Sequence, residues 1–332
     1  MRSDGTVTYV GKDIAYQLWK FGLLGLDFRY CPFLTDGVRT VWITTAEEQP
    51  GTDSPHFGSG TRVYNVIDSR QSYLQNIVLQ GLKALGYEEQ AANSIHFSYE
   101  MVALSPACCA ELGYNLSEEE RKRPYVEVAG RKGLGVKADD LLDTLEGKAL
   151  GEVRARHELP EDDARLIARG ISVGALRYFL LRFARNTVIA FDFKEALSFD
   201  GETGPYVQYA IVRANNIFRK LVEAGIEGMP PALDPAKLRD FLSENDELWE
   251  IAFQAARLPE VVRQVGHSLE LSQLCKYAFQ LAQKFNLFYH KYHVLSESDP
   301  DRRAHLLLIV DLVRRQLTKA LDLLGCEVPL MM

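Results

Sequence analysis

The chain has 332 residues, a hydrophobic share of 47% and a formal net charge of −7. This length is sufficient for two domains with separate cores, and the acidic balance argues against a protein that binds nucleic acid through overall positive charge. No apolar run approaches the roughly 18 residues of a membrane-spanning helix, and the amino terminus lacks the apolar core of a signal peptide. We therefore expect a cytoplasmic protein that does not contact a membrane.

The cysteines argue against a disulfide framework and against a zinc site. There are five of them, an odd number, and their spacing matches no zinc-binding pattern. We expect free thiols at every one of these positions and no protein-bound metal: Cys31, Cys108, Cys109, Cys275 and Cys326.

The first hundred residues alternate between strand and helix patterns. Short apolar runs predict strands at residues 7–10, 41–43, 63–67 and 95–104, with those at 41–43 and 63–67 buried. Helical spacing of apolar residues occurs at 12–24 and 71–85. Strands that alternate with helices predict a parallel α/β sheet.

Residues 105–125 are irregular and favour a solvated surface insertion. Ser117 and Glu120 have the spacing of a capping box at the start of a short helix. Residues 48–61 are rich in Gly, Ser, Thr and Pro and predict a surface loop.

From residue 138 onward the pattern is almost continuously helical. Beyond residue 200, helical runs cover residues 206–224, 245–258, 269–292 and 301–324, separated by Gly, Pro and Ser. This predicts an all-helical bundle as the second domain. The predicted fold is therefore α/β plus all-α, with domains at residues 1–199 and 200–332.

Two predicted strand ends carry polar side chains that could bind a ligand. Tyr9 and Asp13 flank a predicted strand-to-helix turn, the kind of position where open α/β sheets bind ligands. A carboxylate there suits a guanidinium, although Asp13 could equally stabilise the start of a helix. Gln71 follows the strand at 63–67, where its amide could read a polar substrate or cap the local backbone.

A glycine-rich loop at residues 130–135 carries two adjacent cations, Arg131 and Lys132. The glycines on either side, Gly130 and Gly133, would let the backbone approach a phosphate whose charge the cations neutralise. The spacing fits neither a Walker loop nor a dinucleotide fingerprint, so an ordinary basic turn is the alternative.

Taken together, several segments in fixed order resemble the arginyl-tRNA synthetases, which are class I enzymes. They span nearly the whole chain: residues 2–16 with Tyr9 and Asp13, 66–71, 96–102, 130–133, 175–181, 206–210 with Arg213, and 322–332. This resemblance implies the second half of a Rossmann-like catalytic domain, followed by a helical anticodon-binding domain.

The resemblance also implies roles for individual residues. Tyr9, Asp13 and Gln71 would contact the side chain of L-arginine. The ATP site would use the loop residues Gly130, Arg131, Lys132 and Gly133, together with His96 and Met101. The contacts to tRNA(Arg) would come from Tyr206, Tyr209, Arg213 and Met332. The reaction would use ATP with Mg²⁺, and the full-length enzyme would be a monomer.

The chain departs from the class I pattern in two ways. Its loop reads Ala-Gly-Arg-Lys-Gly instead of Lys-Met-Ser-Lys-Ser, and no His-x-Gly-His segment occurs in the sequence. We therefore expect a C-terminal portion that lacks the N-terminal domain and the first half of the nucleotide site, and that is inactive alone. A non-catalytic paralogue that binds RNA or a partner protein is the alternative. A cysteinyl enzyme is disfavoured, because the Tyr9 and Asp13 pair suits a guanidinium better than a thiol.

Overall fold

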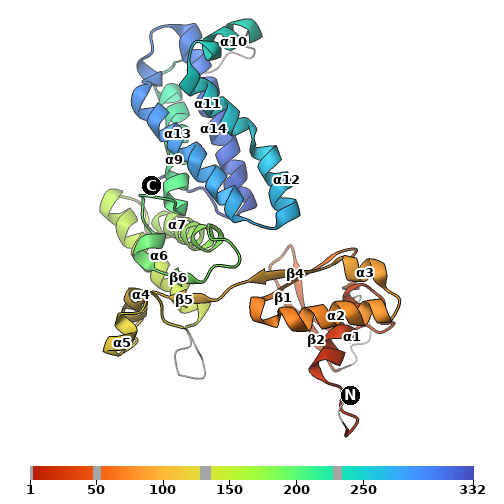
Figure 1. Ribbon diagram of the computed structural model, residues 1–332. Helices are drawn as coiled ribbons and strands as arrows, with labels where there is room; N and C mark the ends of the chain where they lie inside the picture. The colour runs from red at the N-terminus through yellow and green to blue at the C-terminus, as the bar shows by residue number, and fades with distance from the viewer. Residues whose placement is uncertain (1–2, 48–53, 128–135, 227–233) are drawn as a thin grey trace. The chain divides into compact units, whose positions relative to one another are not determined.

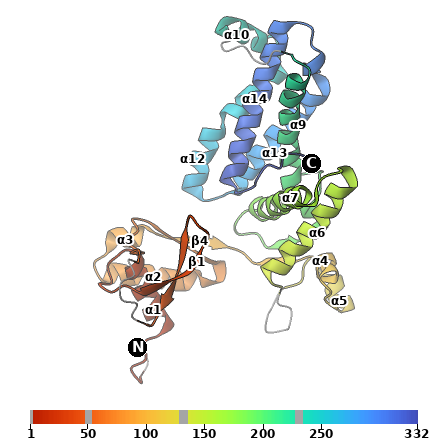
Figure 2. The same ribbon diagram turned by 180° about the vertical axis from the view of Figure 1, so that it is seen from behind.

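The computed structural model describes residues 3–47, 54–127, 136–226 and 234–332. It consists of two compact units, Met1–Glu100 and Met101–Met332, which are described separately here (Figures 1 and 2). Within the described ranges, no helix combines the length and the apolar character that crossing a membrane requires.

The first unit contains a hairpin, a parallel strand pair and helices. Its elements are α1 (Tyr9–Lys20), β1 (Arg29–Thr35), β2 (Thr40–Thr45), β3 (Val63–Asp68), η1 (Ser69–Gln71), α2 (Ser72–Ala84), α3 (Glu88–Ala92) and β4 (Ser94–Tyr99). Strands β1 and β2 are antiparallel, whereas β3 and β4 are parallel and joined through α2 and α3. The predicted parallel β–α–β arrangement is therefore present in this one pair.

The predicted strand at residues 7–10 is wrong. Thr8 is the N-cap of α1, and its side chain accepts a hydrogen bond from the Gly11 N–H, so the helix already begins at Tyr9. The prediction that residues 41–43 and 63–67 are buried is also wrong. Val41 and Val66 are 52% and 64% exposed, because β2 lies in a two-stranded hairpin and β3 in a two-stranded pair.

The predicted strand at 95–104 is two strands with different partners. Strand β4 pairs with β3 in the first unit, whereas β5 (Val102–Leu104) pairs in parallel with β6 (Ile189–Phe191) in the second. The apolar run is continuous in sequence, so only the pairing of each half reveals the break. Strand β6 was not predicted, since its three residues interrupt an otherwise helical pattern.

The second unit is mainly helical. Its first part holds α4 (Pro106–Glu111), α5 (Glu118–Arg121), α6 (Ala138–Arg156), α7 (Glu161–Leu181) and α8 (Phe193–Ala196) besides β5 and β6. The capping box predicted at Ser117 and Glu120 is confirmed at the start of α5. The rest consists of α9 (Gly204–Glu223), α10 (Pro235–Ser243), α11 (Asp246–Ala256), α12 (Leu258–Ser268), α13 (Ser272–Lys291), η3 (Val294–Ser296) and α14 (Pro300–Leu323).

The predicted helical bundle is confirmed. Helices α9, α11, α13 and α14 lie side by side around one apolar core, whose fully buried side chains include Ile211, Leu248, Leu281, Phe285 and Leu306 (Figures 1 and 2). Helix α7 joins this core through Tyr178, whose hydroxyl donates a 2.7 Å hydrogen bond to the Cys275 carbonyl. The predicted domain boundary near residue 200 remains a prediction.

The five cysteines are free, as expected. Four of them are buried, and burial raises the pKa values of Cys108 and Cys326 to about 12. These thiols therefore serve as apolar packing groups.

Candidate nucleic-acid interface

The end of α14 redirects the chain across the bundle. Gly325 has a φ of +68°, and the Cys326 N–H donates a 2.8 Å hydrogen bond to the Leu321 carbonyl. The Gly325 N–H bonds to the Asp322 carbonyl at 3.0 Å, which completes a Schellman motif. Residues 326–332, called the C-terminal segment from here on, leave the helix at this turn.

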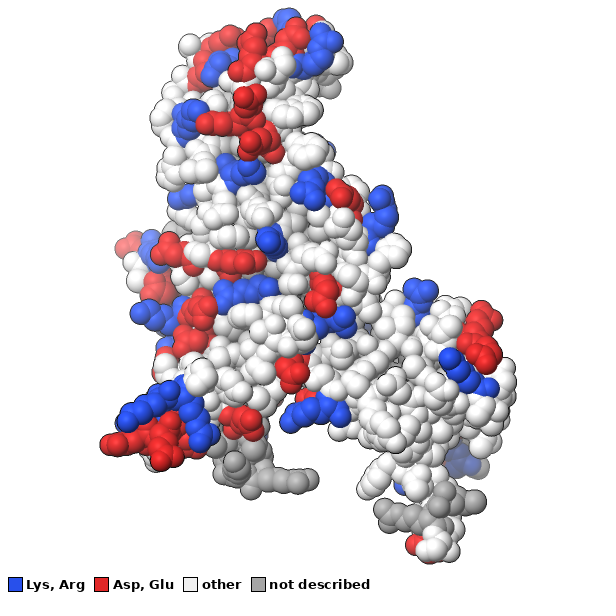
Figure 3. All heavy atoms as spheres, in the orientation of Figure 1, with Lys and Arg blue, Asp and Glu red and all other residues white. Residues whose placement is uncertain are grey.

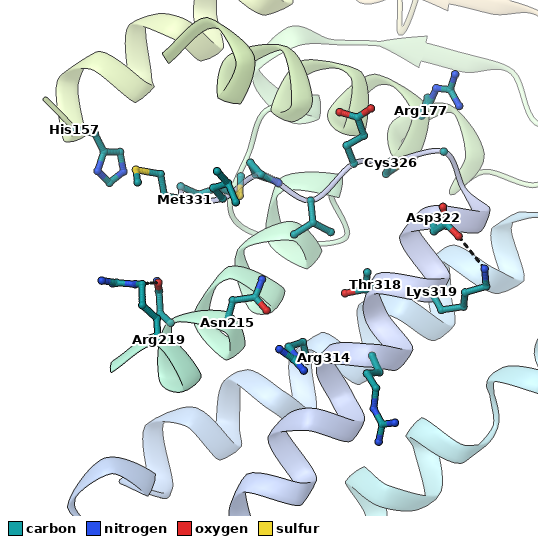
Figure 4. A pocket seen from close by; sticks show the side chains of 18 residues that line it. His157, Arg177, Asn215, Arg219, Arg314, Thr318, Lys319, Asp322, Cys326 and Met331 are labelled. Atoms are coloured by element: carbon teal, nitrogen blue, oxygen red, sulfur yellow. Dashed lines mark hydrogen bonds and ion pairs between the residues drawn. The ribbon is translucent and has the colours of Figure 1, made fainter. Parts of the chain in front are cut away.

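The C-terminal segment forms one wall of an open pocket of about 1640 Å³ (Figure 4). The other lining residues come mainly from α9 and α14, with Arg177 from α7 and His157 at the end of α6. Five of the side chains that line it are cationic: Arg177, Arg219, Arg314, Arg315 and Lys319. Only Asp322 and Glu327 among the lining residues are acidic, so the pocket favours an anionic ligand.

Ion pairs hold four of the five pocket cations, and the partner of two of them, Asp311, is buried. Arg314 and Arg315 both pair with Asp311, at 2.5 and 2.9 Å. Lys319 pairs with Asp322 at 2.9 Å, and Arg219 pairs with a glutamate one turn further along α9. The pairs of Lys319 and Arg219 are exposed on both sides and contribute little stability, so a phosphate can compete for these two cations at low cost.

Positive charge is local in this unit. From Pro205 onward the sequence contains 15 Lys and Arg against 16 Asp and Glu. On the face drawn in Figure 3 both signs are interspersed over the helices. The pocket therefore concentrates cations within a nearly neutral domain. A domain with this charge balance can bind nucleic acid only through such a local group of cations.

A second set of candidate residues consists of aromatic rings grouped around one cation, Arg213. The Arg213 guanidinium lies 4.3 Å from the ring centroid of Tyr209 and 5.1 Å from that of Tyr289. Its Nη1 also donates a 2.9 Å hydrogen bond to Asn286. Tyr209 in turn meets the ring of Phe199 edge-on, at 6.0 Å between centroids.

The four residues predicted to contact tRNA do not share one pocket. Met332 lines the cationic pocket, whereas Tyr206, Tyr209 and Arg213 are outside its lining. Tyr206 is half-buried and packs against Phe279 of α13, at 5.3 Å between ring centroids. Asn216, seven residues after Tyr209 on α9, does line the pocket, so the face that carries Tyr209 borders it.

The residues predicted to bind arginine lie on exposed positions of the first unit. Tyr9 and Asp13 are four apart on α1, so they share a helix face instead of flanking a strand end. Gln71 is exposed at the end of η1, immediately before α2. Among the described residues, no hydrogen bond or ion pair joins Gln71 to Tyr9 or Asp13.

The residues predicted to bind ATP belong to different units of the chain. His96 on β4 has its Nε2 2.9 Å from the Ile67 carbonyl, which holds the ring against the neighbouring strand. Met101 belongs to the second unit. The loop residues Gly130, Arg131, Lys132 and Gly133 lie outside the described residues.

A buried polar network under α1 was not predicted. Gln17 donates a 2.9 Å hydrogen bond to Ser94, and the Lys20 ammonium donates a 2.8 Å bond to Asn65. Burial lowers the pKa of Lys20, although the nearby Asp13 carboxylate opposes this. The polar residues that recur on the apolar face of α1 are the sequence signal that could have revealed this network.

The cations of the pocket were also missed. Their signal in the sequence is modest: an Arg-Arg pair at 314–315 on a mostly apolar helix, and the Asn-Asn pair at 215–216. Neither pair has a spacing that connects it to the other, because the pocket is made by α9 and α14 packing together.

Comparisons with known proteins converge on one family. The model of the DALR anticodon binding domain matches residues 207–332. The chain is 37% identical over 341 residues to the arginine–tRNA ligase of Deinococcus radiodurans, covering 99% of the chain and 51% of that protein. It is 35% identical to the arginine–tRNA ligase of Thermococcus sibiricus, covering 99% of the chain and 48% of that protein.

A solved structure supports the same relationship. The Thermus thermophilus arginyl-tRNA synthetase matches with a TM-score of 0.76 and 28% identity, over 100% of this chain and 50% of that one. The chain thus spans about half the length of the relatives that it matches.

Proposed function

Because the chain matches the C-terminal portion of the arginyl-tRNA synthetase family over 99% of its length, we propose that it serves the attachment of arginine to tRNA(Arg). The reaction uses L-arginine and ATP with Mg²⁺, and it proceeds through arginyl-adenylate. A cytoplasmic location and a monomeric full-length enzyme are part of this proposal.

The proposed activation step is an attack by the arginine carboxylate on the α-phosphorus of ATP, with pyrophosphate as the leaving group. Asp13 would pair with the arginine guanidinium, and Tyr9 and Gln71 would donate or accept hydrogen bonds beside it. Lys132, with Arg131, Gly130 and Gly133, would stabilise the negative charge on the leaving pyrophosphate. His96 and Met101 would border the adenine.

The proposed contribution of the second unit is to bind tRNA. The observation that carries this is the cationic pocket between α9, α14 and the C-terminal segment. All of its lining residues except His157 and Arg177 belong to the residues that match an anticodon binding domain. Its five cations suit a phosphate backbone that bends past the bundle. The ring of Tyr209, on the bordering face, suits an unstacked base of a single-stranded loop.

Binding of tRNA(Arg) at increasing salt tests this proposal. We expect Arg314→Ala/Arg315→Ala to weaken binding and to flatten the dependence of log affinity on log salt concentration, by about 0.7 per lost phosphate contact on a single strand. The matched control is Arg239→Ala/Arg263→Ala, which removes two exposed arginines that do not line the pocket. The proposal fails if the unmodified chain does not prefer tRNA(Arg) to an unrelated tRNA, or if both double variants weaken binding equally.

A further inference from the structure

A single glutamine connects two helices and the C-terminal segment. Gln208 on α9 is fully buried. Its amide nitrogen donates a 3.1 Å hydrogen bond to the Gly170 carbonyl of α7 and a 2.6 Å hydrogen bond to the Glu327 carbonyl. One side chain therefore bonds the main chains of two segments that are more than a hundred residues apart in sequence.

Among uncharged side chains, only a primary amide can make this pair of bonds. Both neighbours are carbonyl oxygens, so the group between them must offer two N–H donors at once. A glutamate at this position would present an acceptor to two acceptors. A methionine of similar shape would leave both carbonyls without the bonds from Gln208.

The surrounding backbone is packed closely enough to fix the amide. A Cβ on Gly174 would collide with the Gln208 amide, and a Cβ on Gly204 would lie 2.6 Å from the Gly174 carbonyl oxygen. Glycine at both positions lets α7 and α9 approach each other at the level of Gln208. The amide consequently has little room to rotate away from Glu327.

Apolar packing also holds the C-terminal segment: Val328 contacts the bundle core, and Pro329 is buried. Cys326 is buried, with its sulfur 3.7 Å from the Gly174 carbonyl. Met331 and Met332 pack against the apolar cluster of α6 and α7, which includes Ile167 and Ile171. Leu330 is 84% exposed, and the bond from Gln208 to Glu327 is a polar attachment of the segment's main chain to the bundle.

We infer that Gln208 is a positioning residue that holds the C-terminal segment in place as the wall of the cationic pocket. This inference rests on the proposed function, because its effect on RNA runs through that pocket. Gln208 does not line the pocket and acts through Glu327 and the residues after it. The same amide connects the wall to α7, which supplies Arg177 to the pocket.

Release of Met332 and Met331 by a carboxypeptidase measures how firmly the segment is held. We expect Gln208→Met to accelerate release by about fivefold, the factor that corresponds to one hydrogen bond of ordinary strength. The matched control is Gln254→Met, which removes another buried amide of the bundle, one that bonds to Gln280 and not to the segment. It should leave the release rate unchanged, and circular dichroism checks that both variants are folded.

Affinity for tRNA(Arg) in a double-mutant cycle tests the connection to the pocket. The cycle combines Gln208→Met with deletion of residues 329–332, which removes most of the wall but keeps Glu327. If Gln208 acts through the wall, its effect on affinity disappears in the shortened chain. Equal effects of Gln208→Met in both backgrounds would show that it acts on the bundle in general, and this would overturn the inference.

The two arms separate failure of this inference from failure of the proposed function. If the unmodified chain does not bind tRNA(Arg), the proposed function fails, while the carboxypeptidase arm still decides whether Gln208 holds the segment. An unchanged release rate in folded Gln208→Met overturns the inference outright. Faster release with unchanged affinity for tRNA overturns its connection to RNA binding.

Discussion

The Arg213 guanidinium lies 4.3 Å from the ring centroid of Tyr209, one turn earlier on α9. Phe199 meets the same ring edge-on, and the Arg213 guanidinium also contacts Tyr289. The ring of Tyr209 is thus oriented before any ligand arrives, while the residue stays partly exposed. Pre-orientation lowers the entropic cost of stacking a base on it.

Replacing Tyr209 with alanine should weaken binding of tRNA(Arg) by about 1–3 kcal/mol, because a base would lose its stacking platform. Tyr209→Phe keeps the ring and should bind nearly as well as the unmodified chain. Fluorescence titration with labelled tRNA measures both affinities, and thermal unfolding of the same samples measures stability.

The rival role for Tyr209 is structural, since Phe199 lies at the end of the predicted catalytic half. In that case Tyr209→Ala lowers the melting temperature, while the remaining folded protein binds tRNA with unchanged affinity. This pattern would rule out Tyr209 as an RNA contact.

Replacing Asp13 with alanine in a full-length enzyme should raise the KM for arginine and leave that for ATP nearly unchanged. A guanidinium that is buried when arginine binds, and that loses its carboxylate partner, loses roughly 2–5 kcal/mol of binding free energy. Steady-state pyrophosphate exchange gives both constants. Glu88→Gln, an exposed change in the first turn of α3, is the control. An arginine KM that does not respond to Asp13→Ala would show that Asp13 only stabilises α1.

The chain as printed should not catalyse ATP–pyrophosphate exchange with arginine. Its sequence contains no His-x-Gly-His segment, which class I enzymes use at the nucleotide. The measurement is exchange by the purified chain, free of host enzyme, with and without tRNA(Arg). Sustained exchange contradicts this prediction. Absent exchange together with specific tRNA binding is also what a non-catalytic paralogue would show, so assay of the full-length protein distinguishes the two.

Asp27 should make the stability of the first unit depend on pH under acid conditions. A hydrogen bond from the Trp19 indole, and further bonds from His56, the Phe28 N–H and Tyr30, lower the pKa of Asp27 to about 2. Because this pKa lies below the value of about 3.9 in an unfolded chain, the stabilisation is complete above that value and is lost as pH falls towards 2.

The comparison of Asp27→Asn with the unmodified chain isolates this effect. The variant should be less stable at neutral pH, and the difference in melting temperature should shrink between about pH 4 and pH 2. Trp19→Phe removes the hydrogen bond from the indole to Asp27, so the pKa of Asp27 should rise. The pH range over which the stabilisation is lost should then be narrower. A difference that stays constant down to pH 2 would mean that the hydrogen bonds to Asp27 do not favour its charged form.

The positions of most helices could be predicted from the sequence because they depend on local patterns. Apolar residues spaced by three and four predicted the long bundle helices, and the Ser117 capping box was visible as two residues three apart. The family resemblance was also readable, since it rests on ordered motifs along the chain. The start of α1 was missed because Val7 to Val10 looks apolar enough for a strand, whereas the Thr8 cap makes Tyr9 helical.

The sequence by itself determined the helical character of the bundle, the free thiols and the resemblance to a tRNA synthetase. Only the tertiary structure decided which residues meet. The run at 95–104 divides because its halves find different partner strands, and the cationic pocket exists because α9, α14 and the C-terminal segment pack together. The role of Gln208 could not be predicted from the sequence. Its buried amide nitrogen is satisfied only by the carbonyls of Gly170 and Glu327, which are distant in sequence and come together in the fold. Local patterns follow from the period of a helix or strand, whereas such long-range contacts follow from how completed elements fill space against one another.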